Sequence, residues 1–133
     1  GSGIDSANCA SSSISSGEGA QTLSASCKDL AGNQGSASYA VNVDKTAPTI
    51  SAAAMGSPNA NGWYNSPLTV QFSCDDTLSG VASCPADQAL SAEGASVSSS
   101  AQTTSDNAGN TSAPSNIVTV QIDRSAPAVS VTV

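Results

Sequence analysis

A duplicated stretch constrains this chain more than any other feature of its sequence. Residues 43–50 read VDKTAPTI, and residues 122–129 read IDRSAPAV, so the two Asp residues are 79 positions apart. Self-similarity at a fixed period is typical of tandem repeats, in which each repeat is one structural unit. The duplicated stretch therefore predicts the joint between one unit and the next.

Further matches follow in the same order between the two joints. The matched pairs are residues 2–4 with 79–81, Cys9 with Cys84, residues 18–20 with 93–95, and residues 29–33 with 106–110. Their spacing drifts by a few positions, as surface loops that accept short insertions allow. We predict three segments: residues 1–43 as the C-terminal part of one repeat, 44–122 as a complete repeat, and 123–133 as a linker with the first strand of a following repeat.

Period-2 alternation bounded by turn residues predicts an all-β chain. The clearest strand covers residues 68–74, where Leu68, Val70, Phe72 and Cys74 share one face. Asn and Gly in residues 106–110 predict a tight turn, because both residue types tolerate a positive φ. Other strands are expected at residues 39–43, 49–53, 80–84, 88–90, 95–105, 117–122 and 128–133. About seven short strands in a unit of this size predict an immunoglobulin-like β-sandwich.

Four cysteines in a chain of low charge predict two disulfides and an oxidising, extracellular location. Each repeat holds two of them, so we pair Cys74 with Cys84 and Cys9 with Cys27. Reduced thiols or a metal site are the alternatives. Zinc is disfavoured, because the sequence has no CxxC spacing and no His.

Charge and composition exclude several classes of function. Ten acidic residues against three basic ones give a net charge of −7, which disfavours nucleic acid and anionic membranes as partners. The sequence has no apolar run long enough to insert into a membrane. Without His there is no Ser-His-Asp or Cys-His arrangement, so we expect a protein that is not an enzyme and has no catalytic residues.

Several motifs between the joints resemble a known family. They are NGWYNSP at residues 61–67, FSCDD at 72–76, SGV at 79–81, CP at 84–85, DNAGN at 106–110 and DKTAP at 44–48. In this order they resemble the tandem bacterial Ig-like repeats of large secreted and cell-surface, adhesin-type proteins. The resemblance covers essentially the whole chain. It implies immunoglobulin-like β-sandwich repeats in tandem that build a stalk or an adhesive array.

Acidic residues in the predicted loops form a candidate calcium site at the joint. In an Ig-like sandwich the loops between strands B and C and between F and G lie where the first strand enters. Calcium binds six to eight oxygen ligands, so carboxylates gathered there could bind it and stiffen the joint. The alternative is that these side chains cap turns or are solvated. The candidate ligands are Asp44, Asp75, Asp76, Asp106 and Asn110.

The joints and the aromatic residues lead to three functional expectations. Pro48 and Pro127 restrict the residue before them, so the joints should be extended and stiff. This favours a structural stalk, spacer or fibre-forming segment of a bacterial surface or secreted protein, with neighbouring Ig-like repeats of the same or an identical chain as partners. One alternative is an adhesive module for a glycan or a host surface protein. Another is a filament subunit joined by β-strand complementation.

Trp63 and Tyr64 are the candidate ligand-binding residues of the adhesive alternative, because adjacent aromatic rings can stack on sugars. Their other interpretation is that they fill the end of a thin core or pack on a neighbour. Asn110-Thr111-Ser112 also fits the acceptor pattern for N-glycosylation.

Overall fold

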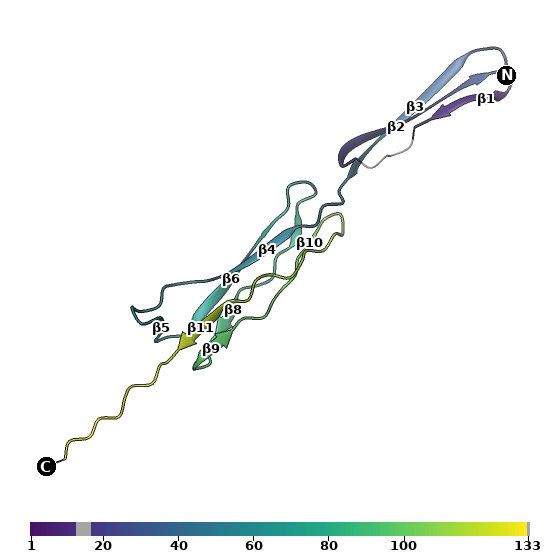
Figure 1. Ribbon diagram of the computed structural model, residues 1–133. Helices are drawn as coiled ribbons and strands as arrows, with labels where there is room; N and C mark the ends of the chain where they lie inside the picture. Colours follow the sequence, from purple (N-terminus) through teal and green to yellow (C-terminus); the bar gives the residue numbers. More distant parts are fainter. Residues whose placement is uncertain (13–16, 133) are drawn as a thin grey trace. The chain divides into compact units, whose positions relative to one another are not determined.

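The computed structural model describes residues 1–12 and 17–132, and all regular elements in this part of the chain are β-strands (Figure 1). The all-β prediction is therefore confirmed. The chain divides into two compact units, Gly1–Thr46 and Ala47–Val133. The division falls within the duplicated stretch at residues 43–50.

The first unit is a single antiparallel sheet of three strands, β1 (Ile4–Ser11), β2 (Gly19–Asp29) and β3 (Gln34–Val43). Strand β2 lies in the middle and pairs with β3 continuously from Gly19↔Val43 to Lys28↔Gln34. Strand β3 thus begins before the predicted strand at 39–43, because residues 34–38, which show no apolar alternation, continue the backbone pairing with β2. Among the described residues of this unit, no side chain is buried.

The second unit contains three small sheets, with strand orders β4-β6-β8, β5-β11-β9 and β10-β7. All pairings are antiparallel except that of β5 with β11, which is parallel. The strands are β4 (Thr49–Ala54), β5 (Trp63–Tyr64), β6 (Leu68–Asp75), β7 (Val81–Ser83), β8 (Gln88–Leu90), β9 (Gly94–Ser98), β10 (Ser105–Asp106) and β11 (Thr119–Ile122).

The core of the second unit lies between β6 and β11. Val70 on β6 and Ile122 at the end of β11 are fully buried. The predicted face of β6 is confirmed, since Leu68, Val70 and Phe72 are buried and Cys74 is half-buried. The remaining core residues are Ala52, Leu90 and Val120, against which Ile50, Ala54, Tyr64, Val97 and Val118 pack.

Three predicted strands of the second unit are shorter than the sequence pattern indicates, and the one predicted at 80–84 is reduced to β7 (Val81–Ser83). The strand predicted at 95–105 is interrupted between β9 and β10, and the one predicted at 117–122 begins at Thr119. Where these two segments face each other, serine hydroxyls accept hydrogen bonds from three backbone amides. Gln102 donates to Ser115, Thr104 to Ser112 and Val118 to Ser99. These side-chain bonds connect the two segments without regular strand pairing.

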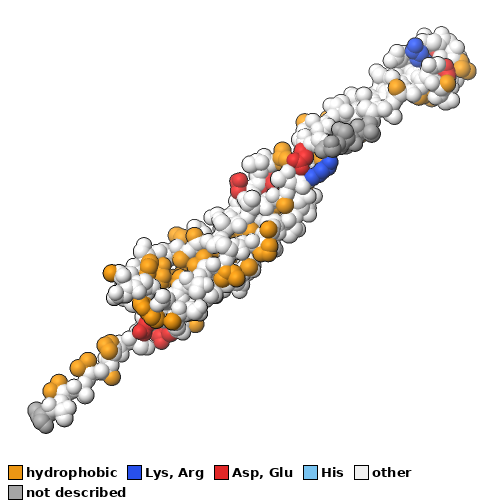
Figure 2. Space-filling model, in the orientation of Figure 1, with side chains coloured by type: hydrophobic (Ala, Val, Ile, Leu, Met, Phe, Trp, Pro, Cys, Tyr) orange, Lys and Arg blue, Asp and Glu red, His pale blue; other side chains and the backbone are white. Residues whose placement is uncertain are grey.

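The strand predicted at residues 128–133 is not present in residues 128–132, and Val133 lies outside the described residues. The matching segment, β4, is a strand because β6 pairs with it along its whole length. Within the described chain no strand pairs with residues 128–132. Figure 2 shows apolar side chains along this C-terminal segment, where Val129 and Val131 are 84% and 89% exposed.

In the first unit β1 begins and β3 ends at opposite ends of β2, and in the second unit β4 begins and β11 ends at opposite ends. Strand β2 runs from Gly19, which pairs with the last residue of β3, to Asp29, which pairs with Ile4 at the start of β1. In the second unit, Thr49 at the start of β4 pairs with Asp75. Ile122 at the end of β11 pairs with Tyr64, whose hydroxyl donates to the Gly56 carbonyl beyond the end of β4.

Candidate functional site: loops and joints of the two units

The two Asp-x-Ala-Gly-Asn loops have the same hydrogen-bond pattern. Asp29 Oδ1 accepts the amides of Ala31 and Asn33 at 2.9 and 2.8 Å, and its Oδ2 accepts Asn33 Nδ2 at 2.9 Å. In the second unit, Asp106 accepts the corresponding amides of Ala108 and Asn110 at 2.9 and 2.8 Å and Asn110 Nδ2 at 2.8 Å. The predicted turn at 106–110 is thus a loop closed by its own Asp carboxylate.

Hydrogen bonds favour the charged form of both Asp residues. The side-chain and backbone amides of Asn33 are the main cause that lowers the pKa of Asp29. Burial by itself would raise the pKa of Asp106, but the bonds from the Asn110 side chain and from the backbone amides of the loop outweigh it and lower that pKa. Both carboxylates are therefore structural parts of their loops.

The candidate calcium ligands of the second unit are engaged in their own loops. Asp76 Oδ1 accepts the amides of Leu78 and Gly80 at 3.2 and 2.7 Å, so it closes the loop after β6 as Asp106 closes the next one. One carboxylate oxygen of Asp76 lies within 4.8 Å of one from Asp106. Asp75, the last residue of β6, is exposed. Calcium binding by these residues stays a prediction.

Asn110 has a structural role that bears on the glycosylation pattern. Its Nδ2 atom, to which a glycan would be attached, donates to Asp106 Oδ2 at 2.8 Å. Asp106 is only 3% exposed, so this bond lies at a buried position. A glycan on Asn110 would replace one of the two hydrogens of Nδ2, so the remaining one would have to make the bond to Asp106.

Each joint begins with an Asp that binds the backbone two residues later. Asp44 Oδ1 accepts the amide of Thr46 at 3.0 Å, and Asp123 Oδ1 accepts the amide of Ser125 at 2.9 Å. Asp44 belongs to the first unit, as the division of the chain at Thr46 shows. These turns give the joint residues a defined backbone conformation.

Two glutamates that the sequence did not identify as site residues also bind the joints. Glu18 accepts the Lys45 amide at 2.8 Å through Oε1, and its two oxygens lie 3.1 and 2.8 Å from the Thr46 hydroxyl. Glu93 accepts the Arg124 amide through Oε1 at 2.9 Å and the Ser125 hydroxyl through Oε2 at 3.3 Å. Arg124 Nε is also 3.4 Å from Glu93 Oε1. The repeated Glu-Gly-Ala sequence at 18–20 and 93–95 is the feature of the sequence that could have identified these two glutamates.

The structure contains the disulfides Cys9–Cys27 in the first unit and Cys74–Cys84 in the second. The two disulfides do not occupy matching positions in their units. Cys9 and Cys27 are directly opposite each other on β1 and β2. Cys84 matches Cys9 but is bonded to Cys74 on β6, and Thr104, which matches Cys27, donates its hydroxyl to the Ser83 carbonyl instead. Two disulfides favour an oxidising environment.

Trp63 and Tyr64 form the two-residue strand β5 beside β11. Both side chains are half-buried, and Tyr64 packs against the core. The Asp123 amide donates to the Tyr64 carbonyl at 3.0 Å, so β5 also binds the residue that follows β11. Sugar binding by these two residues stays a prediction.

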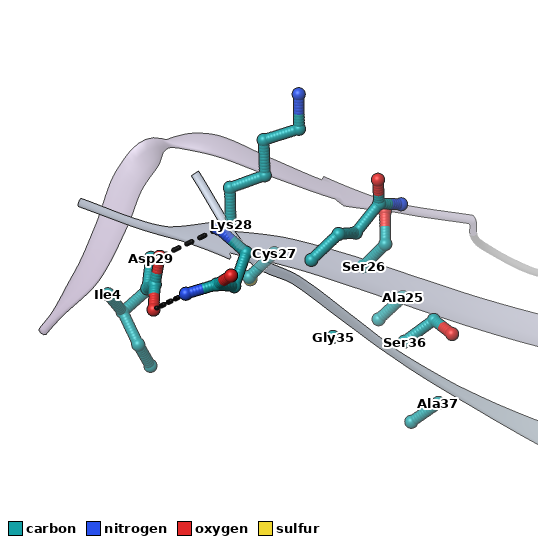
Figure 3. A pocket seen from close by; sticks show the side chains of 11 residues that line it. Ile4, Ala25, Ser26, Cys27, Lys28, Asp29, Gly35, Ser36 and Ala37 are labelled. Carbon is teal, nitrogen blue, oxygen red and sulfur yellow. Dashed lines mark hydrogen bonds between the residues drawn. The ribbon is translucent and has the colours of Figure 1, made fainter. Parts of the chain in front are cut away.

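A hollow of about 540 Å³ lies on the first unit near the turn between β2 and β3 (Figure 3). Its lining includes Ile4, Cys27, Lys28 and small side chains such as Ala25 and Gly35. Asp29 is the acidic residue of this lining, and its carboxylate is bonded to its own loop. The hollow therefore offers apolar surface rather than a set of reactive groups.

The described part of the chain contains no apolar helix of membrane-spanning length. Comparisons of the chain with protein-family models, with curated proteins and with solved structures find no match.

Proposed function

We propose that this chain is a non-enzymatic, extracellular segment of tandem Ig-like repeats that acts as a stiff spacer in a bacterial surface or secreted protein. The observation that carries the proposal is the path of the chain through the second unit, in which β4 begins at one end and β11 ends at the other. Repeats with such a path can follow one another in series, as a stalk requires. Neighbouring repeats of the same kind are the partners that this function needs.

Two further observations support repeated modules and an extracellular location. The loops at 29–33 and 106–110 share their hydrogen bonds, and matched glycines in the two units, Gly32 and Gly109, have positive φ values of 90° and 95°. Only glycine adopts this conformation without strain. The two disulfides fit an oxidising compartment, where a small core benefits most from them.

The distance distribution between the two units tests the spacer function. Spin labels are placed at the exposed positions Ser36 and Ser96 by a bioorthogonal amino acid, which leaves both disulfides intact. Pulsed electron spin resonance of the 133-residue chain should give one narrow distance peak. A broad distribution would show a flexible joint and overturn the proposal.

Self-assembly by strand addition is the second candidate, because the first unit has an open sheet edge. Strand β3 is ten residues long, contains no charge and no proline, and pairs only with β2 among the described strands. Such edges accept additional strands unless charges or prolines block them. Sedimentation should then show association that rises with concentration and is lost in Ser38→Lys. A wild-type chain that stays monomeric at high concentration excludes this function.

A further inference from the structure

The carboxylates of Glu18 and Glu93 accept hydrogen bonds from residues at the start of the two joints. Each accepts one backbone amide and one hydroxyl from the two residues that follow the joint Asp. The donors and acceptors of each set belong to the same unit, since the first set ends at Thr46 and the second lies wholly beyond Ala47. The same contact thus occurs independently in both units.

The residue types of the joint follow from these contacts. The position after the Asp contributes its amide to the Glu, so either Lys45 or Arg124 can occupy it. The next position needs a hydroxyl, and it is Thr46 in one joint and Ser125 in the other. Each Glu is followed by a glycine with positive φ, 79° at Gly19 and 153° at Gly94, where the chain turns into the next strand. A side chain at either glycine would strain this turn.

In the first joint, hydrogen bonds and a proline act on successive residues. Thr46 is bonded to Glu18 and Asp44, and Pro48, the second residue of the next unit, is buried. Ala47 is the residue between them, and the proline that follows it restricts it to extended conformations. The hydrogen bonds therefore fix Thr46, and the proline restricts the residue that follows it.

We propose that Glu18 and Glu93 are positioning residues that clamp the first residues of each joint onto the preceding unit and so fix the direction in which the chain leaves it. The inference rests on the proposed spacer function, because a fixed direction is what makes a series of units stiff. Charged acceptors make stronger hydrogen bonds than neutral ones, which suits carboxylates to this role. The clamp is a property of each unit by itself.

Hydrogen exchange of the clamped amides tests the contact directly. In Glu18→Ala we expect the protection of the Lys45 amide to fall by about tenfold or more, since a hydrogen bond to a charged group is lost. Glu18→Gln keeps one oxygen acceptor and should restore part of the protection. The amides of Ala31 and Asn33 report that the first unit remains folded. Unchanged protection at Lys45 in a folded Glu18→Ala chain overturns the clamp.

The distance between the labels at Ser36 and Ser96 tests the consequence of the contact. Glu18→Ala should broaden the distribution, and Glu18→Gln should broaden it less. Glu93→Ala is the matched control: it should release the Arg124 amide but leave this distance unchanged, because its joint lies beyond both labels. A narrow distribution in both wild type and Glu18→Ala overturns the clamp and leaves the spacer function intact. A broad wild-type distribution rejects the spacer function. The hydrogen-exchange protection of the Lys45 amide then still tests whether Glu18 binds the joint.

Discussion

Single carboxylates determine the conformation of the two Asp-x-Ala-Gly-Asn loops, and this makes their stability dependent on pH. The pKa values of Asp29 and Asp106 are lowered in the folded chain from the ordinary value of 3.8. A lowered folded pKa means that the unfolded chain binds protons more readily. The stabilisation is therefore complete above the ordinary pKa and is lost as the pH falls through the folded value.

We accordingly expect the melting temperature to fall as the pH decreases below about 4, measured by circular dichroism over a series of buffers. Asp106→Asn should lower the melting temperature at neutral pH, because it removes an acceptor from a buried loop. The same variant should lose less of its remaining stability in acid than wild type does. An equal loss in acid for both chains would contradict the role given to Asp106.

Individual apolar residues of the second unit differ sharply in what they contribute. Ile122 is fully buried, whereas Ile117, five positions earlier, is 58% exposed. Ile122→Ala should lower the free energy of unfolding by about 2 to 5 kcal/mol, because it leaves a cavity in the core. Ile117→Ala should change it by less than about 0.5 kcal/mol. Urea denaturation measures both, and similar losses in the two variants would be inconsistent with this core.

At the scale of elements, each disulfide stabilises the unit that contains it. Cys74–Cys84 connects β6 to the residue after β7, and Cys9–Cys27 connects β1 to β2. The two closed loops span 10 and 18 residues, which corresponds to about 3 kcal/mol each by the loss of unfolded-state entropy. Replacing Cys74 and Cys84 together by Ala should destabilise the second unit by about this amount.

Residue-resolved hydrogen exchange distinguishes the two units in this experiment. The double Cys74→Ala, Cys84→Ala variant should lose protection in β6 and β11 and keep it in β2. The double Cys9→Ala, Cys27→Ala variant is the matched control and should show the reverse. Loss of protection in both units from either change would mean that the units do not unfold separately.

Strands with strong alternation could be predicted from the sequence, and strands made mostly of small polar residues could not. Strand β6 was predicted to within one residue, because its apolar residues occupy every second position. The break between β9 and β10 was missed because serine hydroxyls accept bonds in place of carbonyls there, and the pattern of residue types does not show this. Strand β5 has only two residues, too few for any period to be visible.

The loops of the candidate site could be anticipated, and the clamps could not. Asp and Asn in a Gly-containing turn predict a local closure, since donor and acceptor are a few positions apart. Glu18 and Glu93 bind joint residues that are 27 and 31 positions away in the sequence. Their partners depend on the register of β2 with β3 and of β9 with β11, which the sequence does not specify.

At the scale of the whole molecule, the unequal distribution of charge bears on calcium. The second unit has six acidic side chains and Arg124 as its one basic residue, whereas the first has four acidic and two basic residues. In the second unit, carboxylate oxygens of Asp76 and Asp106 lie within 4.8 Å of each other. The amides of their loops compensate part of this repulsion. A divalent cation would compensate more of it, since Ca²⁺ binds carboxylate oxygens.

The calcium site predicted from the sequence also includes Asp44, a residue of the first unit. Calorimetry of the chain should show a higher melting temperature in calcium than in excess chelator. Calcium at a hundred times its dissociation constant would add about 2.7 kcal/mol. Asp44→Ala and Asp76→Asn should each reduce this shift, whereas Asp87→Asn, in the exposed segment before β8, should keep it. No shift in any of these chains would mean that the carboxylates only close their own loops.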